Sequence, residues 1–315
     1  MSENLQHASV MLAAAVQALN IKPEGIYVDA TFGRGGHSQA ILGCLNQKGR
    51  LIALDRDVGA IETAERIKDE RFCFVHAPFS RIESVLADFG LSLIDGLLLD
   101  LGVSSPQLEE AGRGFSFQKD GHLDMRMDTT QGQSALEWIN SASEDEMSTV
   151  IRELGEERFH KRIARAIVRT RKDVPITRTL QLAELVKATL PVREPHKHPA
   201  TRTFQAVRMH VNHELEELDK VLEASMRILV PGGRLVVISF HSLEDRRVKK
   251  FIASQYKTDR YPERLPVKAN QISPSRMRPV GHALFPDKAE IAVNPRARSA
   301  VLRVAERTDE PCLAA

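Results

Sequence analysis

A glycine-rich turn is the first stretch of the sequence whose residues could do chemistry. In "VDATFGRGGHSQ" (residues 28–39), an apolar run ends at an aspartate, glycines follow, and a helical pattern continues. Glycines allow positive φ and close backbone approach, and the N-terminus of the following helix favours negative groups. This geometry is typical of nucleotide sites. The dinucleotide pattern G-x-G-x-x-G is incomplete, however, because Ser38 stands where its last glycine would be.

Two acidic residues favour a cationic ligand at this turn over a phosphate. Asp29 comes just before the turn and would repel a pyrophosphate, whereas S-adenosylmethionine has no phosphate and carries an ammonium that an acid can accept. Asp55 ends the second apolar run, where a carboxylate can bind both hydroxyls of a ribose. The spacing therefore predicts a site for S-adenosylmethionine, with a nicotinamide oxidoreductase as the first alternative.

The ends of the third and fourth apolar runs add further candidates. Phe79, in "HAPFSRI", could flank an adenine or belong to the core. "LLLDLGVSSPQ" (97–107) resembles the [DNS]-P-P-[YF] loop of methyltransferases that act on exocyclic amines, with one proline fewer and no aromatic residue. Acceptors that bind the protons of such an amine can hold this weak nucleophile in place. We therefore expect Asp100 to orient the donor or the target amine, and Ser104 and Ser105 to accept from the amine.

Alternating strand and helix patterns must position these groups. Apolar runs at 26–30, 50–55, 72–76 and 94–100, separated by helical patterns, predict right-handed βαβ units and a parallel sheet, whose ligands bind at the carboxyl ends of the strands. The next such run, 233–240, comes far too late for one crossover helix, so a helical domain must be inserted. The predicted class is α/β, a Rossmann-like sheet divided as 1–107, 108–202 (inserted) and 203–315.

Three further predictions concern the second half of the chain. Apolar residues at three- and four-residue spacing predict one long helix over 203–229, ended by the turn "VPGG". The segments 290–294 and 299–306 read as an antiparallel hairpin at the edge of the sheet. The Gly-rich stretch 112–132 reads as a lid or as a plain linker.

Composition limits the remaining classes of function. The chain has 315 residues and a formal charge of +2, so a nucleic-acid partner must be argued from local clusters. Its three cysteines have no CxxC spacing, which disfavours a zinc site and fits a reducing cytoplasm; we expect no metal. No apolar run approaches the roughly 20 residues of a membrane span. No motif indicates the oligomeric state, and a homodimer remains open.

Local basic clusters are the candidate contacts for a nucleic acid. "RFHKRIARAIVRTRK" (158–172) places cations on one helix face and apolar residues on the other, although such a face can also be merely solvated. Further clusters are "REPHKHPATR" (193–202), "HSLEDRR" (241–247, where Ser242 could instead cap a helix), the closing hairpin turn and the basic stretch 255–288. The residues predicted to contact it, which are RNA-binding residues on the resemblance described next, are Arg162, Arg165, Arg169, Arg202, His241, Arg246, Arg296 and Arg298.

Several motifs together resemble one known family. "VDATFGRGGHS", "HAPFS", "DLGVSSPQL", "ISFHSLEDR" and "NPRARSA", in this order, are similar to the ribosomal RNA small subunit methyltransferase H family, also called MraW. The resemblance covers nearly the whole chain. It implies a class I S-adenosylmethionine-dependent methyltransferase domain interrupted by a helical substrate-recognition domain.

The resemblance also implies a reaction and a set of cofactor residues. The reaction is methyl transfer to N4 of a cytidine in the decoding centre of 16S rRNA, with the small ribosomal subunit as partner. The implied cofactor residues are Gly35, Gly36, His37, Asp55, Phe79, Asp100 and Gln107; His37 and Gln107 rest on the resemblance alone. Two alternatives remain: a non-catalytic RNA-binding assembly factor, and an amino-methyltransferase of DNA.

Overall fold

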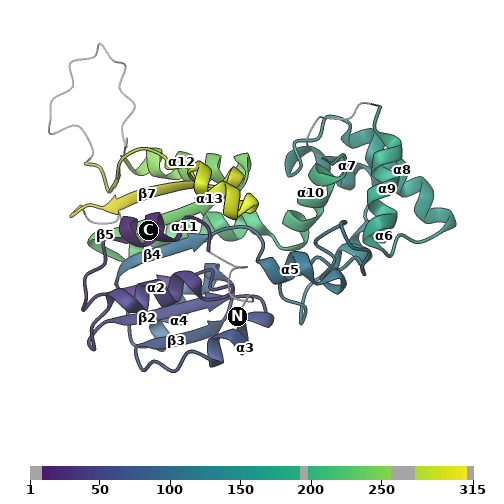
Figure 1. The fold of residues 1–315 in the computed structure, drawn as a ribbon. Helices are drawn as coiled ribbons and strands as arrows, with labels where there is room; N and C mark the ends of the chain where they lie inside the picture. The colour runs from purple at the N-terminus through teal and green to yellow at the C-terminus, as the bar shows by residue number, and fades with distance from the viewer. Residues whose placement is uncertain (1–8, 192–197, 257–273, 311–315) are drawn as a thin grey trace, which may run out of the picture. The chain divides into compact units, whose positions relative to one another are not determined.

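The chain folds into two compact units (Figure 1). The structure is a computed structural model, and it describes residues 9–191, 198–256 and 274–310. One unit combines the chain up to Gly102 with the chain from Glu216 onward, and the other is Val103–Leu215. The junctions therefore lie a few residues before the first predicted boundary and about a dozen residues after the second.

A seven-stranded sheet forms the centre of the first unit, in the order β3-β2-β1-β4-β5-β7-β6. Strands β1 to β5 are parallel, whereas β7 runs antiparallel to its neighbours β5 and β6. This is the Rossmann-like α/β sheet that the alternating pattern predicts, and the predicted fold class is confirmed. The strands are β1 (Ile26–Asp29), β2 (Arg50–Asp55), β3 (Phe72–His76), β4 (Ile94–Asp100), β5 (Leu229–Ser239), β6 (Met277–Pro279) and β7 (Val301–Arg307).

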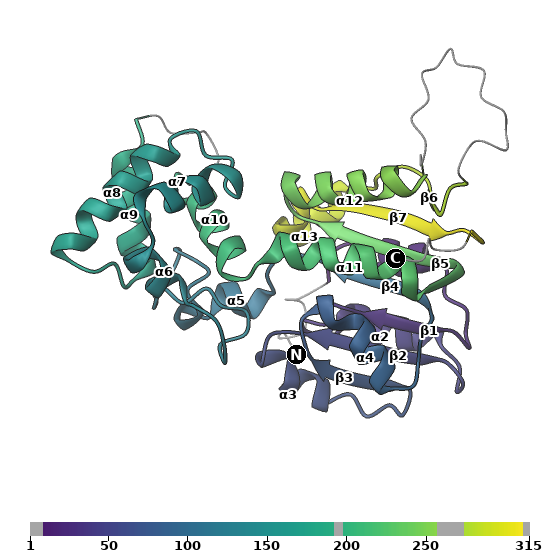
Figure 2. The same ribbon diagram turned by 180° about the vertical axis from the view of Figure 1, so that it is seen from behind.

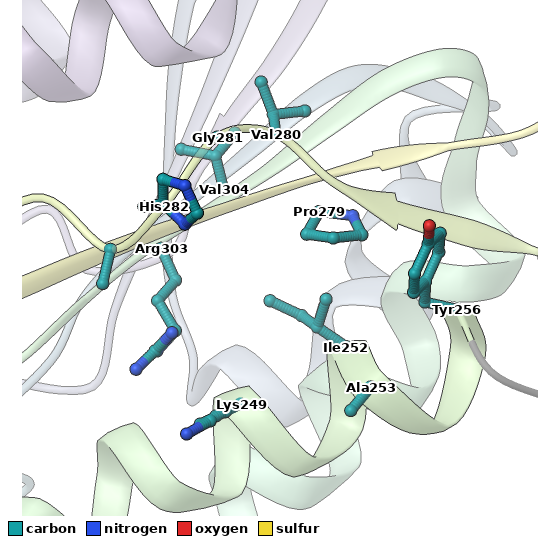
Figure 3. A pocket seen from close by; sticks show the side chains of 11 residues that line it. Lys249, Ile252, Ala253, Tyr256, Pro279, Val280, Gly281, His282, Arg303 and Val304 are labelled. Carbon is teal, nitrogen blue, oxygen red and sulfur yellow. The ribbon is translucent and has the colours of Figure 1, made fainter.

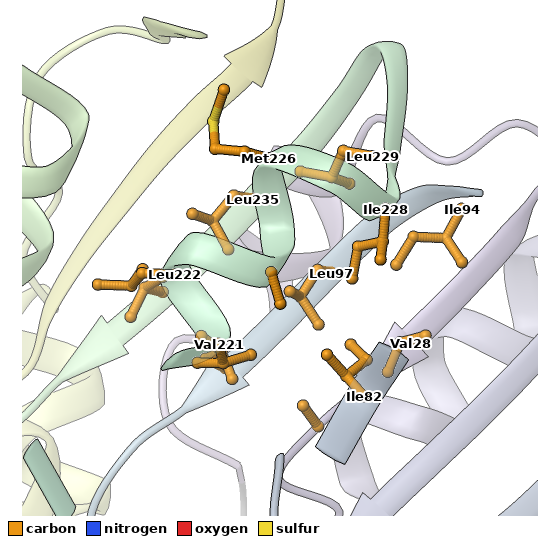
Figure 4. Close-up of a cluster of buried hydrophobic side chains, with 14 of the residues drawn as sticks. Val28, Ile82, Ile94, Leu97, Val221, Leu222, Met226, Ile228, Leu229 and Leu235 are labelled. Atoms are coloured by element: carbon orange, nitrogen blue, oxygen red, sulfur yellow. The ribbon is translucent and has the colours of Figure 1, made fainter. Parts of the chain in front are cut away.

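Helices bury both faces of this sheet, which explains why its strands are continuously apolar. In β4, Leu98 packs in the cluster that contains residues of α1 and α2, while Leu97 and Leu99 pack with residues of α4, α11 and α12 (Figure 4). The face that carries α11 and α12 is turned to the viewer in Figure 2. The helices are α1 (Leu12–Leu19), α2 (Gly36–Cys44), α3 (Gly59–Glu65), α4 (Ile82–Asp88), α11 (Glu214–Ile228), α12 (Ser242–Tyr256) and α13 (Lys288–Val293).

The second unit is helical, and its described residues form no named strand. Stretch 112–132 is neither a lid nor a linker: Leu123 and Met125 are fully buried in the core of this unit. Asn212 fixes the stretch, because its side chain donates to the carbonyl of Met125 and accepts from the N–H of Met127, both at 2.7 Å. The helices are α5 (Ser105–Glu109), α6 (Ala135–Ser141), α7 (Glu144–Glu153), α8 (His160–Asp173), α9 (Thr179–Thr189) and α10 (Thr201–Val211).

The second half of the chain departs from the prediction in two places. The helix expected over 203–229 is two helices, α10 and α11, separated where His213 adopts a left-handed φ of 51°. The "VPGG" segment does not end the helix as a turn, because β5 begins at Leu229 and contains it, with a shift of register against β4.

The predicted hairpin at the sheet edge is also wrong. Strand β7 forms as expected, but residues 290–294 fall in α13 and its C-terminal cap. Asp287 caps this helix by accepting the N–H of Glu290 at 2.7 Å, and an Asp followed three residues later by Glu is a signature of a helix start. This cap outweighs the preference of the short apolar run for a strand. None of the described helices is long and apolar enough to cross a membrane.

Candidate active site

Three aspartates end neighbouring strands at the carboxyl edge of the sheet: Asp29 on β1, Asp55 on β2 and Asp100 on β4. Asp29 is fully buried, and its oxygens accept from the Thr31 N–H at 3.2 Å and the Ser38 hydroxyl at 2.7 Å. Burial raises its pKa to about 6. Asp29 therefore holds the glycine turn to the first turn of α2, and the ammonium acceptor that we expected here must be sought elsewhere.

Asp55 connects the second strand to the glycine turn. One carboxylate oxygen accepts from the Gly33 N–H at 2.7 Å and the other from the Asp57 N–H at 2.8 Å. Burial, then the nearby Asp57 and Asp29 charges, raise the pKa of Asp55 to about 6, against the lowering effect of these two hydrogen bonds. Each oxygen retains a lone pair, so the carboxylate can still accept from both hydroxyls of a ribose.

The glycine turn is shaped by its own packing. Gly35 precedes α2 with φ of 74°, and a Cβ at this position would lie 2.8 Å from the ring of Phe32. A Cβ at Gly36 would meet the hydroxyl of Ser9. Gly35 is thus required for the turn that brings the N-terminus of α2 to the strand ends, whereas a Cβ at Gly36 would force the Ser9 side chain to move.

Asp100 has a side-chain carboxylate oxygen to which no described residue donates. Its N–H donates to the Thr31 hydroxyl at 2.6 Å, but its Oδ1 is buried and has no hydrogen-bond partner among the described residues. Burial, followed by the charges of Asp29 and Glu244, raises its pKa well above the ordinary value. A buried acceptor without a donor is costly, so a bound ammonium or amine would stabilise it.

His37 lies beside Asp100 in a defined tautomer. Burial lowers its pKa to about 4, so the ring is neutral at physiological pH. Its Nε2 lies 3.2 Å from the carbonyl of Val10 and donates to it, which leaves Nδ1 as an acceptor 3.7 Å from the Asp100 carboxyl. No periodicity or spacing in the sequence indicates this role, because it depends on a backbone carbonyl 27 residues away.

The edge as a whole is suited to a cation with hydroxyl groups. Asp29, Asp55 and Asp100 concentrate negative charge, and Glu244 adds to it. A pyrophosphate would be repelled, while S-adenosylmethionine carries a sulfonium, an ammonium and a ribose diol. The unpartnered oxygen of Asp100 and the spare lone pairs of Asp55 therefore fit this cofactor. Phe79 follows β3 in a short 3-10 helix (Phe79–Arg81) and is half-buried against the core.

The turn after Asp100 belongs to the second unit. Ser104 and Gln107 form a capping box at the start of α5, in which the Gln107 side chain accepts from the Ser104 N–H at 2.9 Å. Ser105 opens the helix and Pro106 follows it, which stiffens the turn. The sequence signature S-x-x-Q indicates such a box, although we predicted only a cofactor role for Gln107.

Some of the predicted RNA-binding residues are exposed, and others contact residues of the protein itself. Arg162, Arg165 and Arg169 lie on the exposed face of α8, opposite the buried Ile163 and Ile167, as its periodicity predicts. Arg165 also pairs with Glu144 at 3.3 Å on the surface. Exposed cations are also present at Arg246, Arg296 and Arg298.

Two predicted RNA contacts have structural partners instead. Arg202 lies 3.8 Å from the buried Glu157. His241 precedes α12, and Glu244 reaches back to accept from the Phe240 and His241 N–H groups at 2.8 and 3.3 Å. Glu244 therefore satisfies two backbone N–H groups at the start of α12. Parts of two predicted clusters, 193–197 and 257–273, lie outside the described residues.

Comparison with known proteins identifies the family. The model of the MraW methylase family matches residues 4–308. The chain belongs to the MraW methylase family. As a member, it is an S-adenosylmethionine-dependent methyltransferase of class I fold, and its acidic sheet edge fits that cofactor.

Solved structures give weak likenesses to this MraW family member. A putative rRNA methylase from Clostridium thermocellum is 12% identical with a TM-score of 0.43, covering 96% of this chain and 99% of its own. An rRNA methylase from Streptococcus thermophilus is 13% identical with a TM-score of 0.40, covering 98% and 99%.

The glycine turn yields a first prediction. Gly35→Ala should weaken S-adenosylmethionine binding at least tenfold, because a left-handed backbone costs a residue with a Cβ about 1–2 kcal/mol and the methyl group also meets Phe32. Isothermal titration calorimetry measures the affinity. Gly43→Ala in α2, where a Cβ would meet nothing within 4 Å, is the matched control and should bind normally. Equal binding by both variants would contradict the assigned role of the turn.

The raised pKa values yield a second prediction. Because the pKa of Asp55 in the free protein is about 6 and that of Asp100 is also raised, lowering the pH through about 6 protonates groups that the cofactor needs charged. Affinity for S-adenosylmethionine should therefore fall as pH falls through this range, and binding near pH 6 should release protons.

Titrations in two buffers of different ionisation enthalpy measure this proton release. Asp100→Asn should release fewer protons, while Asp88→Asn, which changes an exposed carboxyl on α4, should behave as the unchanged protein. Affinity that is constant between about pH 5.5 and about pH 8, without proton release, would rule out a cation-binding role for these carboxyls.

Proposed function

We propose that this protein transfers a methyl group from S-adenosylmethionine to the exocyclic N4 of a cytidine in the decoding centre of 16S rRNA. Membership of the MraW methylase family and the early resemblance support this assignment. The observation that supports it most directly is the buried Oδ1 of Asp100 at the tip of β4, which has no hydrogen-bond donor among the described residues. An amine nitrogen could donate to this oxygen, and it lies at the edge where open α/β sheets bind ligands.

The cofactor side of the reaction rests on the first unit. The Asp55 carboxylate binds the ribose, Phe79 flanks the adenine, and Gly35 and Gly36 shape the turn that receives the remainder. S-adenosylmethionine supplies, when bound, a methyl group on a positively charged sulfur. Neutral His37 lies beside the Asp100 carboxyl without adding a positive charge that would oppose the cation.

The target side explains why acceptors are needed. A cytidine inside folded RNA must be swung out before N4 reaches the methyl carbon. Asp100, Ser104, Ser105 and carbonyl oxygens of the 101–105 turn would then accept from the N4 protons and hold the lone pair in line. The nitrogen forms its bond to carbon as the carbon–sulfur bond breaks, and the extra proton leaves to water, so no dedicated base is required.

RNA contacts outside the pocket are proposed for exposed cations of both units. In the second unit, Arg162, Arg165 and Arg169 form one face of α8 that can follow a phosphate backbone. In the first unit, Arg246, Arg296 and Arg298 are exposed. Such contacts orient the RNA and do not select its sequence, so the choice of nucleotide must come from the fold of the ribosomal RNA around the target.

A nucleoside analysis tests this function. The protein is incubated with methyl-labelled S-adenosylmethionine and unmethylated small ribosomal subunits, and the digested RNA is separated by chromatography. We expect the label in N4-methylcytidine. Naked 16S rRNA and single-stranded DNA are run in parallel, since label in DNA alone would favour a DNA amino-methyltransferase. Donor binding without any label would favour an assembly factor.

The same assay tests Asp100. At saturating donor, Asp100→Asn should lower kcat about 100-fold, because the amine loses an acceptor of the right geometry. The exposed Asp88→Asn is the matched control and should retain full activity. If Asp100→Asn raised only the KM for the donor, Asp100 would serve the cofactor alone; full activity at every donor concentration would remove it from the site.

A further inference from the structure

A cavity between α12 and the edge of the sheet lies apart from the carboxyl groups described above (Figure 3). It has a volume of about 190 Å³. Ile252 of α12, Val304 of β7 and Pro279 at the end of β6 form an apolar floor. Lys249 and Tyr256 of α12 and His282 after β6 stand around it. Ligand sites for larger molecules usually measure roughly 300–1,000 Å³, so this cavity is suited to one flat ring.

The charges around the cavity favour an anion. Among the residues that the structure describes, no acidic side chain lines it. Arg303 also lines the cavity, but its guanidinium donates to both oxygens of Asp245 at 2.6 and 3.0 Å, so its charge is largely balanced. Lys249 is exposed and forms no ion pair with any residue that the structure describes. One unbalanced ammonium thus stands beside an apolar pocket.

Two rings give the pocket a surface on which a base can stack. Tyr256 is 44% exposed, which is unusual for a large ring that could pack on the adjacent core. His282 is exposed on the opposing segment. Unpaired bases stack on such rings, and the phosphate attached to them pairs with a nearby cation. Lys249 and Tyr256 are two helical turns apart, about 10 Å, within the combined reach of a nucleotide and a lysine side chain.

We propose that this cavity binds one unpaired nucleotide of the RNA substrate, with its base against Tyr256 and the apolar floor and its phosphate beside Lys249. The inference rests on the proposed RNA substrate. The first unit would then bind the RNA at a second place, separate from the target cytidine. An acidic peptide is the competing occupant, but it would leave the exposed rings without a partner.

Fluorescence anisotropy of a labelled single-stranded oligoribonucleotide of about ten nucleotides tests this proposal with the full chain. Lys249→Ala should weaken binding about fivefold and lower the salt slope by about one. Tyr256→Ala should weaken binding about five- to tenfold. Ala253→Trp, introduced from the exposed side of α12, should fill the cavity and weaken binding as much as Tyr256→Ala.

Lys250→Ala is the matched control, because Lys250 is an exposed neighbour on α12 that does not line the cavity. It should bind the oligonucleotide within about twofold of the unchanged protein, since its side chain leaves α12 in another direction and does not line the cavity. Equal losses at Lys249 and Lys250 would indicate diffuse attraction and overturn the proposal. Unchanged binding by Ala253→Trp, or equal competition from an oligoglutamate peptide, would also overturn it. Unfolding midpoints and S-adenosylmethionine titrations confirm that each variant is folded.

The result can be separated from the fate of the proposed reaction. If the unchanged protein methylates cytidine N4 while the cavity variants bind the oligonucleotide normally, only the cavity proposal fails. If no cytidine N4 is methylated but the cavity variants lose oligonucleotide binding, only the proposed reaction fails.

Discussion

The structure depends on placing carboxyl groups where water is scarce. Asp29, Asp55 and Asp100 end three strands at one edge of the sheet, and burial raises the pKa of each. Such groups destabilise the folded protein at neutral pH unless something compensates for their charge. Asp29 and Asp55 are compensated by the turn itself, whose N–H groups and Ser38 hydroxyl bind them. Asp100 is not, so its carboxyl either takes up a proton or is compensated by a cationic ligand.

The same constraint explains the parts of the site that carry no charge. A protonated histidine beside Asp100 would compensate for its charge in advance and weaken the attraction for a ligand. His37 is kept neutral by burial and oriented by the carbonyl of Val10. The glycines let the turn close on Asp55 without side chains that would meet Phe32 or Ser9. Before a ligand binds, the site therefore keeps a buried carboxylate oxygen of Asp100 without a hydrogen-bond donor from any residue that the structure describes.

Local signals in the sequence were sufficient for the sheet and its acidic edge. Strands buried on both faces are continuously apolar, so β1 to β4 could be placed nearly to the residue, and Asp55 and Asp100 with them. The predictions that were wrong or missing concerned features that depend on contacts between residues far apart in the chain, or on two local signals that favour different structures. His37 is oriented by a residue 27 positions away. The break before α11 lies at His213, next to Asn212, whose side chain binds the backbone of Met125 and Met127 some 85 positions earlier in the chain. The sequence pattern of a helix cap is present at Asp287, but the apolar run that follows it favoured the prediction of a strand.

The measurement that tests the central claim most directly is a comparison of two ligands by isothermal titration calorimetry at neutral pH. S-adenosylmethionine matches the acidic edge in charge and hydroxyl groups, whereas NADH brings a pyrophosphate to the same turn. The account predicts saturable binding of S-adenosylmethionine and no binding of NADH. Binding of NADH with comparable affinity, or failure of S-adenosylmethionine to bind, would contradict it.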